Sequence, residues 1–318
     1  MDRIWGGRKL EDLYHKPIPG GKKIGESWEV SDRPGAESKV AHGPLAGKSI
    51  RWLIENHTQD MLGSGYSGSE RFPLLIKILD AQEKLSLQVH PPQEIATSLG
   101  GEPKTEVWYI ADATPEASLF VGLKKGITPE RFARDIEHNR VADCFHEIRV
   151  KKGDSMFLPS GRVHALGAGN VIFEIQQNSD TTYRVYDWDR RNPDGSTREL
   201  HVEKSLKSID FNDFEPRLSD PVPQLLSPGY TLKQLANDPL FHVSLHENQN
   251  AVSLKRSAKS GFLILGFVEG SAVLTSSTME SPLYLRAGQF CFIPDSVRDS
   301  VVSLAPKSKI LEIHKPLL

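Results

Sequence analysis

The sequence predicts a mostly β protein made of two β-barrels with a few short helices. Three observations support this fold class. The 25 glycines and 21 prolines are scattered over all 318 residues, as expected for many short elements joined by turns. Short apolar runs recur at spacings typical of antiparallel sheets in a sandwich or barrel. A short motif in the first half of the chain is repeated in the second half, which indicates two related units.

Strand-like runs fill the first half of the chain. Residues 74–90, LLIKILDAQEKLSLQVH, contain two apolar runs around a polar stretch, so we expect either paired strands or two strands linked by a short turn. Further runs are short and bounded by turn residues. They are Val107–Ile110, Ser118–Val121, Glu147–Val150, Ser155–Leu158, Val171–Gln176 and Tyr183–Tyr186.

Helices are expected at two places in this region. Thr128 is a good N-cap and Pro129 suits the first helical position, so a helix should begin there, with Phe132 and Ile136 on one face. A second short helix is expected at Gln93–Leu99. The last third of the chain again carries short apolar runs, at Phe241–Leu245, Phe262–Phe267, Ala272–Leu274, Phe290–Ile293 and Ile310–Ile313.

A proline-rich stretch indicates where the two units join. Prolines 216, 221, 223 and 228 interrupt a segment with little periodicity, and a chain of this length commonly forms two units. We expect a first β domain with a small helical insertion at residues 1–215. Residues 216–318 are expected to form a second β domain.

Composition excludes several classes of partner. The 39 basic and 41 acidic residues give a formal charge of −2, which provides no overall attraction for nucleic acid. Cys144 and Cys291 have neither disulfide-framework nor metal-site spacing, which favours a reducing compartment. No run approaches the roughly 20 apolar residues that span a bilayer. We therefore expect a cytoplasmic protein with no membrane partner.

The motif that carries the chemistry runs from Gly153 to His164, as Gly-x5-Pro-x-Gly-x2-His. The glycine opens a strand, Pro159 and Gly161 shape a turn, and the turn presents the histidine. This pattern resembles the second motif of the cupin superfamily, which predicts two cupin-like (jelly-roll) β-barrels. The segment aligns without gaps on Gly288–Asp299, where Asp299 replaces the histidine.

The other expected metal ligands precede this motif. Gln88 and His90 are two residues apart on a strand and therefore point to the same face, and Glu106 opens the next apolar run. Two imidazoles, a carboxylate and a weak amide oxygen suit Zn²⁺, with positions left for substrate oxygens. The alternatives are a loop histidine at His90 and a hydrogen-bonding histidine at the barrel mouth for His164.

Several segments together resemble type I mannose-6-phosphate isomerase in its short bacterial form. They occur in family order across residues 1–205. They are IWGG at Ile4–Gly7, LSLQVHPP at Leu85–Pro92, KTEVWYI at Lys104–Ile110, GDSMFLPSGRVHALG at Gly153–Gly167 and FEIQQNSDTTYRVYDWDR at Phe173–Arg190.

The resemblance implies one catalytic zinc per chain and interconversion of mannose 6-phosphate and fructose 6-phosphate through an enediol. It places the zinc ligands at Gln88, His90, Glu106 and His164. Residues 1–215 are therefore expected to be the catalytic, metal-binding cupin domain, and residues 216–318 a cupin-like β domain without a metal site. The active-site arginine falls on Arg184. Ser86, Lys104 and Asp180 match positions of the substrate pocket.

Two roles stay open at this point. Arg184 is expected to bind the phosphate together with Lys104, or to lie over the reacting carbons. Lys104 or Glu174 is expected to transfer the proton. The competing functions are a non-catalytic cupin that binds sugar phosphates and an Fe²⁺-dependent cupin oxygenase. The chain is expected to be a monomer or a homodimer.

Overall fold

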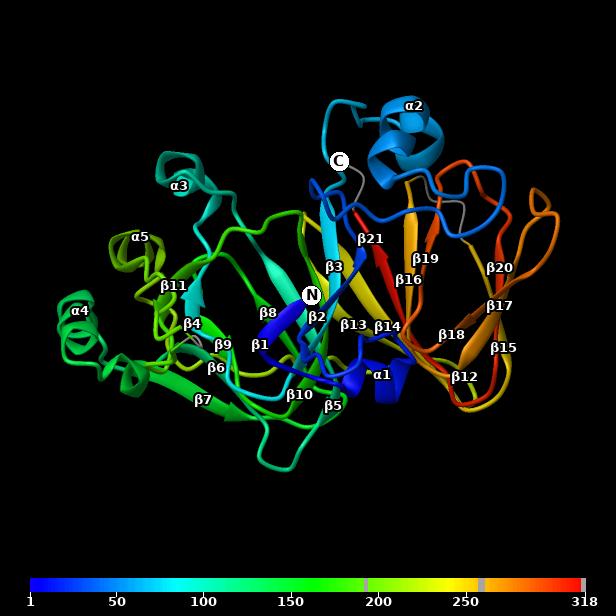
Figure 1. Cartoon of the computed structure of the whole chain (residues 1–318). Coiled ribbons are helices and arrows are strands. Elements are labelled where there is room, and N and C mark those ends of the chain that lie inside the picture. Colours follow the sequence, from blue (N-terminus) through cyan, green and yellow to red (C-terminus); the bar gives the residue numbers. More distant parts are fainter. Residues whose placement is uncertain (192–193, 257–260, 316–318) are drawn as a thin grey trace. The chain divides into compact units, whose positions relative to one another are not determined.

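The computed structural model describes residues 1–191, 194–256 and 261–315 (Figure 1), and they form two compact units. The first unit comprises residues 1–8, 19–27 and 78–219, and the second comprises 9–18, 28–77 and 220–318. The division points after residues 27 and 77 fall within strands β2 and β3. The expected domains 1–215 and 216–318 therefore stay a prediction. The last point at which the chain passes from one compact unit to the other follows Ser219.

The first unit contains two antiparallel sheets. One has the order β2-β3-β10-β5-β8 and the other β11-β4-β9-β6-β7, while β1 covers Asp2–Gly7. The bounds of the first sheet are Glu26–Val30, Leu74–Ala81, Asn170–Gln177, Glu106–Ala113 and Ser155–Leu158 in that order. Those of the second are Tyr183–Tyr186, Leu87–Val89, His164–Leu166, Ser118–Leu123 and Phe145–Arg149. Because β3 and β4 belong to different sheets, the expected strands in residues 74–90 exist but are not paired.

One core fills the space between these two sheets. It joins residues such as Trp108 and Ile110 of β5 with Leu119 of β6 and Leu166 of β9. The sheets thus face each other as an open jelly roll, and the mostly β, cupin-like fold is confirmed although the sheets do not close into barrels.

A second core lies on the other face of the β11-β4-β9-β6-β7 sheet. Leu87 and Val89 of β4 pack there with Phe132 of helix α4 (Pro129–Glu137). Helices α3 (Gln93–Ala96) and α5 (Val202–Ser208) gather with α4 near the edge of this sheet (Figure 1). Thr128 caps α4 by accepting a hydrogen bond from the amide of Arg131, as predicted. The remaining short elements are η1 (Thr97–Leu99) and η2 (Val141–Cys144).

The second unit is also a pair of sheets around one core. A six-stranded sheet has the order β12-β13-β14-β21-β16-β19, and a four-stranded sheet has the order β15-β20-β17-β18. The six strands are Gln224–Ser227, Tyr230–Asn237, His242–Asn248, Lys309–His314, Leu263–Glu269 and Phe290–Ile293. The four are Val252–Lys255, Val301–Leu304, Ser271–Thr275 and Leu283–Arg286. Helices α1 (Lys9–Tyr14) and α2 (Ile50–Leu62) belong to this unit and, like α5, were not predicted.

The strand pairing supports the internal repeat. Leu158 of β8 lies opposite Glu106 of β5, and its counterpart in the repeat, Ile293, lies opposite Leu263. In the same registers Glu174 lies opposite Trp108, and Glu312 lies opposite Leu265. Equivalent strands are therefore paired in the same register within each unit. Leucines occupy the second-unit positions of Glu106 and Trp108, whereas a glutamate is present at both Glu174 and Glu312.

None of the helices in the described ranges combines the length and the apolar character needed to cross a bilayer.

We expect Phe132→Ala to lower the free energy of unfolding by about 3–5 kcal/mol, because it empties a buried site where the ring packs against Phe145 and Phe211 at centroid distances of 6.0 and 5.7 Å. Urea denaturation followed by circular dichroism measures the change. The exposed Arg134→Ala on the same helix should stay within about 0.5 kcal/mol of wild type. A Phe132→Ala loss no larger than this control would show that α4 does not close the second core.

Candidate metal centre

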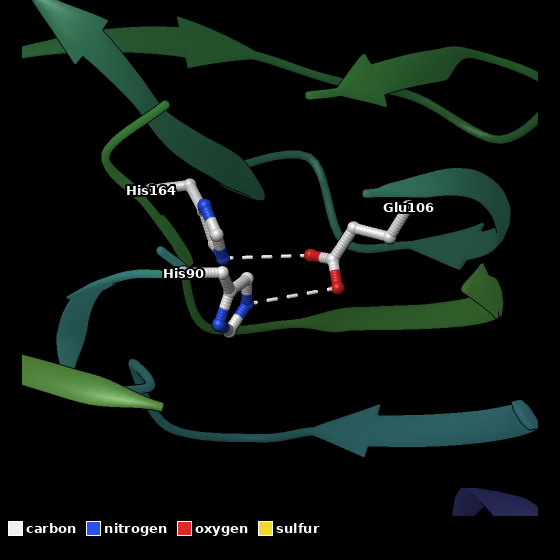
Figure 2. A group of neighbouring side chains, drawn as sticks. All are labelled: His90, Glu106 and His164. Carbon is white, nitrogen blue, oxygen red and sulfur yellow. Dashed lines mark ion pairs between the residues drawn. The ribbon is translucent and has the colours of Figure 1, made fainter. Parts of the chain in front are cut away.

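Three of the predicted ligands converge in the first unit. His90 follows β4, Glu106 is the first residue of β5, and His164 is the first residue of β9. One potential ligand atom from each lies within 4.8 Å of the others, and all three side chains are buried (Figure 2). Segments distant in sequence thus bring two imidazoles and one carboxylate to a single point.

The glycine–proline motif shapes the turn that presents His164. Gly153 and Gly161 have φ angles of 95° and 91°, in the left-handed region that favours glycine. Strand β8 ends just before Pro159, and the amide of Gly161 then donates to the carbonyl of His90 at 2.8 Å. The turn is therefore attached to the segment that carries the other candidate histidine ligand.

Backbone carbonyls fix the orientation of both imidazoles. Nδ1 of His90 lies 2.8 Å from the carbonyl of Thr181, and Nδ1 of His164 lies 2.9 Å from the carbonyl of Arg162. A carbonyl only accepts hydrogen bonds, so each Nδ1 carries the proton and each Nε2 of the neutral ring carries a lone pair. These Nε2 atoms lie 3.7 and 3.4 Å from the carboxylate oxygens of Glu106.

Burial keeps His164 neutral. Desolvation is the largest effect and lowers the pKa of His164 to about 4, so its Nε2 is unprotonated at neutral pH. Metal binding requires this deprotonated state. The donor set of two oriented imidazoles and one carboxylate, all buried, therefore fits Zn²⁺.

Gln88 lies beside this group. On paired strands it lies opposite His164 of β9 and opposite Arg184 of β11, so the three side chains form a row on one face of the sheet. The Nε2 atoms of Gln88 and His164 are 3.3 Å apart. A half-turn of the amide would place the oxygen at the same point. This position is compatible with the prediction that Gln88 is a fourth ligand, which stays a prediction.

Lys104 and Glu174 extend the centre. The ammonium of Lys104 lies 2.8 Å from Glu106 Oε2 and 4.0 Å from Glu174 Oε1. Burial alone would lower the pKa of Lys104, but the charges of Glu106 and Glu174 outweigh it and raise that pKa. The indole of Trp108 donates to Glu174 Oε1 at 3.0 Å and meets His164 edge-on. Lys104 is therefore a buried cation between two carboxylates.

The remaining predicted residues lie in the same unit at different distances from the centre. Nε of Arg184 donates to the hydroxyl of Ser86 at 3.3 Å. Burial, followed by repulsion from Arg198, lowers the pKa of Arg184. Asp180 is exposed, and the next residue, Thr181, provides the carbonyl that orients His90.

Some groups that shape the centre had no signal in the sequence. The carbonyls of Thr181 and Arg162 act through the backbone, which any residue type supplies. Trp108 lies in the predicted strand Val107–Ile110, but its hydrogen bond to Glu174 was not predicted.

Comparisons with known proteins agree on one family. The model of the phosphomannose isomerase type I catalytic domain matches residues 1–125. The chain is 35% identical to mannose-6-phosphate isomerase ManA of Bacillus subtilis over 298 residues, covering 92% of this chain and 90% of that protein. It is 43% identical to the probable mannose-6-phosphate isomerase GmuF of the same organism, over 65% of each chain.

Solved structures show the same relationship. The crystal structure of mannose 6-phosphate isomerase from Bacillus subtilis matches with a TM-score of 0.88 and 31% identity, covering 99% of this chain and 96% of that one. A zinc-bound mannose 6-phosphate isomerase shares the fold with a TM-score of 0.77 at 19% identity.

We expect the metal-free protein to lose stability as the pH falls from about 6.5 to about 4. The folded state holds the pKa of His164 below its ordinary value of 6.5, so the unfolded state binds more protons in this window. Full protonation of His164 should lower the free energy of unfolding by about 3 kcal/mol. Because other groups also titrate here, urea unfolding should be compared with His164→Gln at each pH. Equal pH slopes for the two proteins would contradict the low pKa.

Proposed function

We propose, since the chain belongs to the type I mannose-6-phosphate isomerase family, that its buried histidine–carboxylate centre catalyses the interconversion of mannose 6-phosphate and fructose 6-phosphate. The observation that carries this proposal is the convergence of His90, Glu106 and His164 within one cupin-like unit. The reaction moves a proton between C1 and C2 while the carbonyl relocates, through an enediol.

His90, Glu106 and His164 would hold the metal, with Gln88 as the fourth ligand. Zinc is the metal that we assign, because the donor set suits it and a zinc-bound mannose 6-phosphate isomerase has this fold. When bound, the ion supplies a Lewis acid that stabilises negative charge on substrate oxygens. Thr181 and Arg162 hold the two imidazoles in the ligating tautomer through their carbonyls.

Glu174 is the group that we assign to proton transfer between the two carbons. Its carboxylate accepts from Trp108, which fixes its direction, and it is buried next to Lys104. Lys104 has a raised pKa and stays protonated at neutral pH, so it is unsuited to be the base. It is suited to neutralise Glu106 and Glu174 and to donate a hydrogen bond to a substrate oxygen.

Arg184 and Ser86 are assigned to substrate binding. The guanidinium of Arg184 contacts the Ser86 hydroxyl and lies in the same cross-strand row as Gln88. Asp180 is assigned to the rim of the pocket because it is exposed and adjacent to Thr181. The competing functions are a non-catalytic sugar-phosphate cupin and an Fe²⁺ oxygenase. They are tested by adding Zn²⁺ or Fe²⁺ to metal-free protein, with and without oxygen, and measuring the fructose 6-phosphate formed from mannose 6-phosphate.

Further assignments rest on composition and family alone. The partner is a small sugar phosphate, and a net charge of −2 gives no basis for nucleic-acid binding. We assign the protein to the cytoplasm, as a monomer or homodimer. Residues 1–215 are assigned as the catalytic domain and residues 216–318 as a β domain without a metal site.

We expect His90→Asn and His164→Asn each to abolish stoichiometric zinc binding and to lower kcat by at least about 10³-fold, because each removes one of the buried ligands. Zinc content by elemental analysis and coupled assays for fructose 6-phosphate are the measurements. The exposed His42→Asn is the matched control and should keep both. Full zinc content in either ligand variant would disprove the assigned centre.

We expect Glu174→Gln to lower kcat by at least about 10²-fold at unchanged zinc content, because the amide keeps the shape but is a poor base. Exchange of the C2 proton of mannose 6-phosphate with deuterated water, followed by NMR, should slow equally. The exposed Glu147→Gln serves as the control. If exchange at C2 stays normal while only the affinity falls, Glu174 binds substrate and is not the base.

A further inference from the structure

Three arginines surround one carboxylate next to the proposed substrate site. Arg198 donates through Nε to Asp187 Oδ2 at 2.7 Å and through Nη2 to Oδ1, and Arg190 donates to the same Oδ1. Arg184 is close enough for the charge of Arg198 to contribute to lowering its pKa. Within this arginine cluster (Arg184, Arg190 and Arg198), Asp187 contacts two of the guanidinium groups, and the charges of Asp187 and Glu199 both act on the third, Arg184.

The arginine cluster is next to the candidate metal ligands Gln88 and His164. Arg184 lies opposite Gln88 on paired strands, and Gln88 lies opposite His164. The hydroxyl of Ser86, which is buried, accepts from Arg184. A ligand that spans this row therefore has one end at the metal centre and the other at the cluster.

The turn at residues 187–190 is held in a costly conformation. Trp188 and Asp189 both have positive φ angles, 58° and 53°, which non-glycine residues rarely adopt. The indole of Trp188 donates to the carbonyl of Leu85, and Arg190 donates to the carbonyl of Lys84, both at 2.7 Å. These bonds attach the turn to the residues just before Ser86. Arg190 thus has a local structural role.

Arg198 differs from Arg190 in its contacts. Two of its five N–H groups donate to Asp187, and a quarter of its side chain is exposed. Asp187 orients the guanidinium, but Asp187 and Glu199 carry only two negative charges against the three cations of the cluster. Partly buried like charges destabilise a protein unless an anion joins them. The surplus positive charge therefore points to an anionic ligand.

We propose that Arg198, oriented by Asp187, binds the phosphate of the substrate together with Arg184 and so determines specificity for phosphorylated sugars. This rests on the proposed function. A sugar phosphate carries close to two negative charges at neutral pH, and arginine binds such oxygens with two parallel hydrogen bonds. Lys104, which the sequence suggested for this role, instead places its ammonium between Glu106 and Glu174.

The test compares Arg198→Gln and Arg198→Lys with wild type in the zinc-loaded enzyme. We expect Arg198→Gln to raise KM for mannose 6-phosphate and the Kd for inorganic phosphate, from calorimetry, at least about tenfold, with kcat changed less than threefold. Arg198→Lys should lie between because lysine lacks the two-pronged geometry. Arg140→Gln removes an exposed arginine from an ion pair with the buried Asp135 and should change neither constant.

Two results would overturn the proposal: phosphate affinity and KM that match wild type in Arg198→Gln, or a loss of kcat and zinc content without a loss of phosphate affinity. If Arg198→Gln does not fold, an unchanged phosphate affinity in Arg198→Lys overturns it as well. Failure of the proposed function is a separate outcome. In that case the wild type binds phosphate and Arg198→Gln binds it more weakly, yet the wild type forms no fructose 6-phosphate.

Discussion

The centre depends on the buried carboxylate of Glu106. Its two oxygens face one imidazole each, and Lys104 lies 2.8 Å from one of them. An ionised carboxylate that is fully removed from water is unfavourable unless cations or ligated metal compensate it. The two histidines and the lysine are therefore arranged around one charge.

The alternation of β4 places its side chains in two different surroundings. Leu87 and Val89 point into the core beneath the helices, while Gln88 points to the face that carries His164 and Arg184. A shift of one residue in this strand would bury the amide in an apolar core and expose the two hydrophobic side chains. Packing on the far face of the sheet thus determines the register of the chemical groups on the near face.

Much of this arrangement could be predicted from the sequence, and the reasons differ by residue. The i, i+2 spacing of Gln88 and His90, and the glycine–proline turn before His164, are local patterns that report directly on geometry. The strands of the first half and the helix after Thr128 followed from apolar runs and an N-cap. Helices α1 and α5 were missed because tertiary packing stabilises such short segments more than their own pattern does. Helix α2, also missed, is longer but is interrupted by non-helical backbone at His57.

Contacts between segments distant in sequence were the least predictable. The sequence gives no signal that Lys104 lies between two carboxylates, since that depends on how β5 and β10 are paired. The same holds for Asp187 and its arginines, which meet next to a turn where Trp188 and Asp189 adopt left-handed angles. The carbonyls that orient the imidazoles could not be predicted either, because every residue type has a backbone carbonyl.

The repeated strand order shows what the scaffold requires and what it does not. In the second unit Leu263 and Leu265 stand where the first has Glu106 and Trp108, and Leu265 is buried in an apolar core between the two sheets. An equivalent pair of sheets thus forms around an apolar core, with leucines at the positions of Glu106 and Trp108. The pairing of these strands therefore does not require the candidate ligand Glu106.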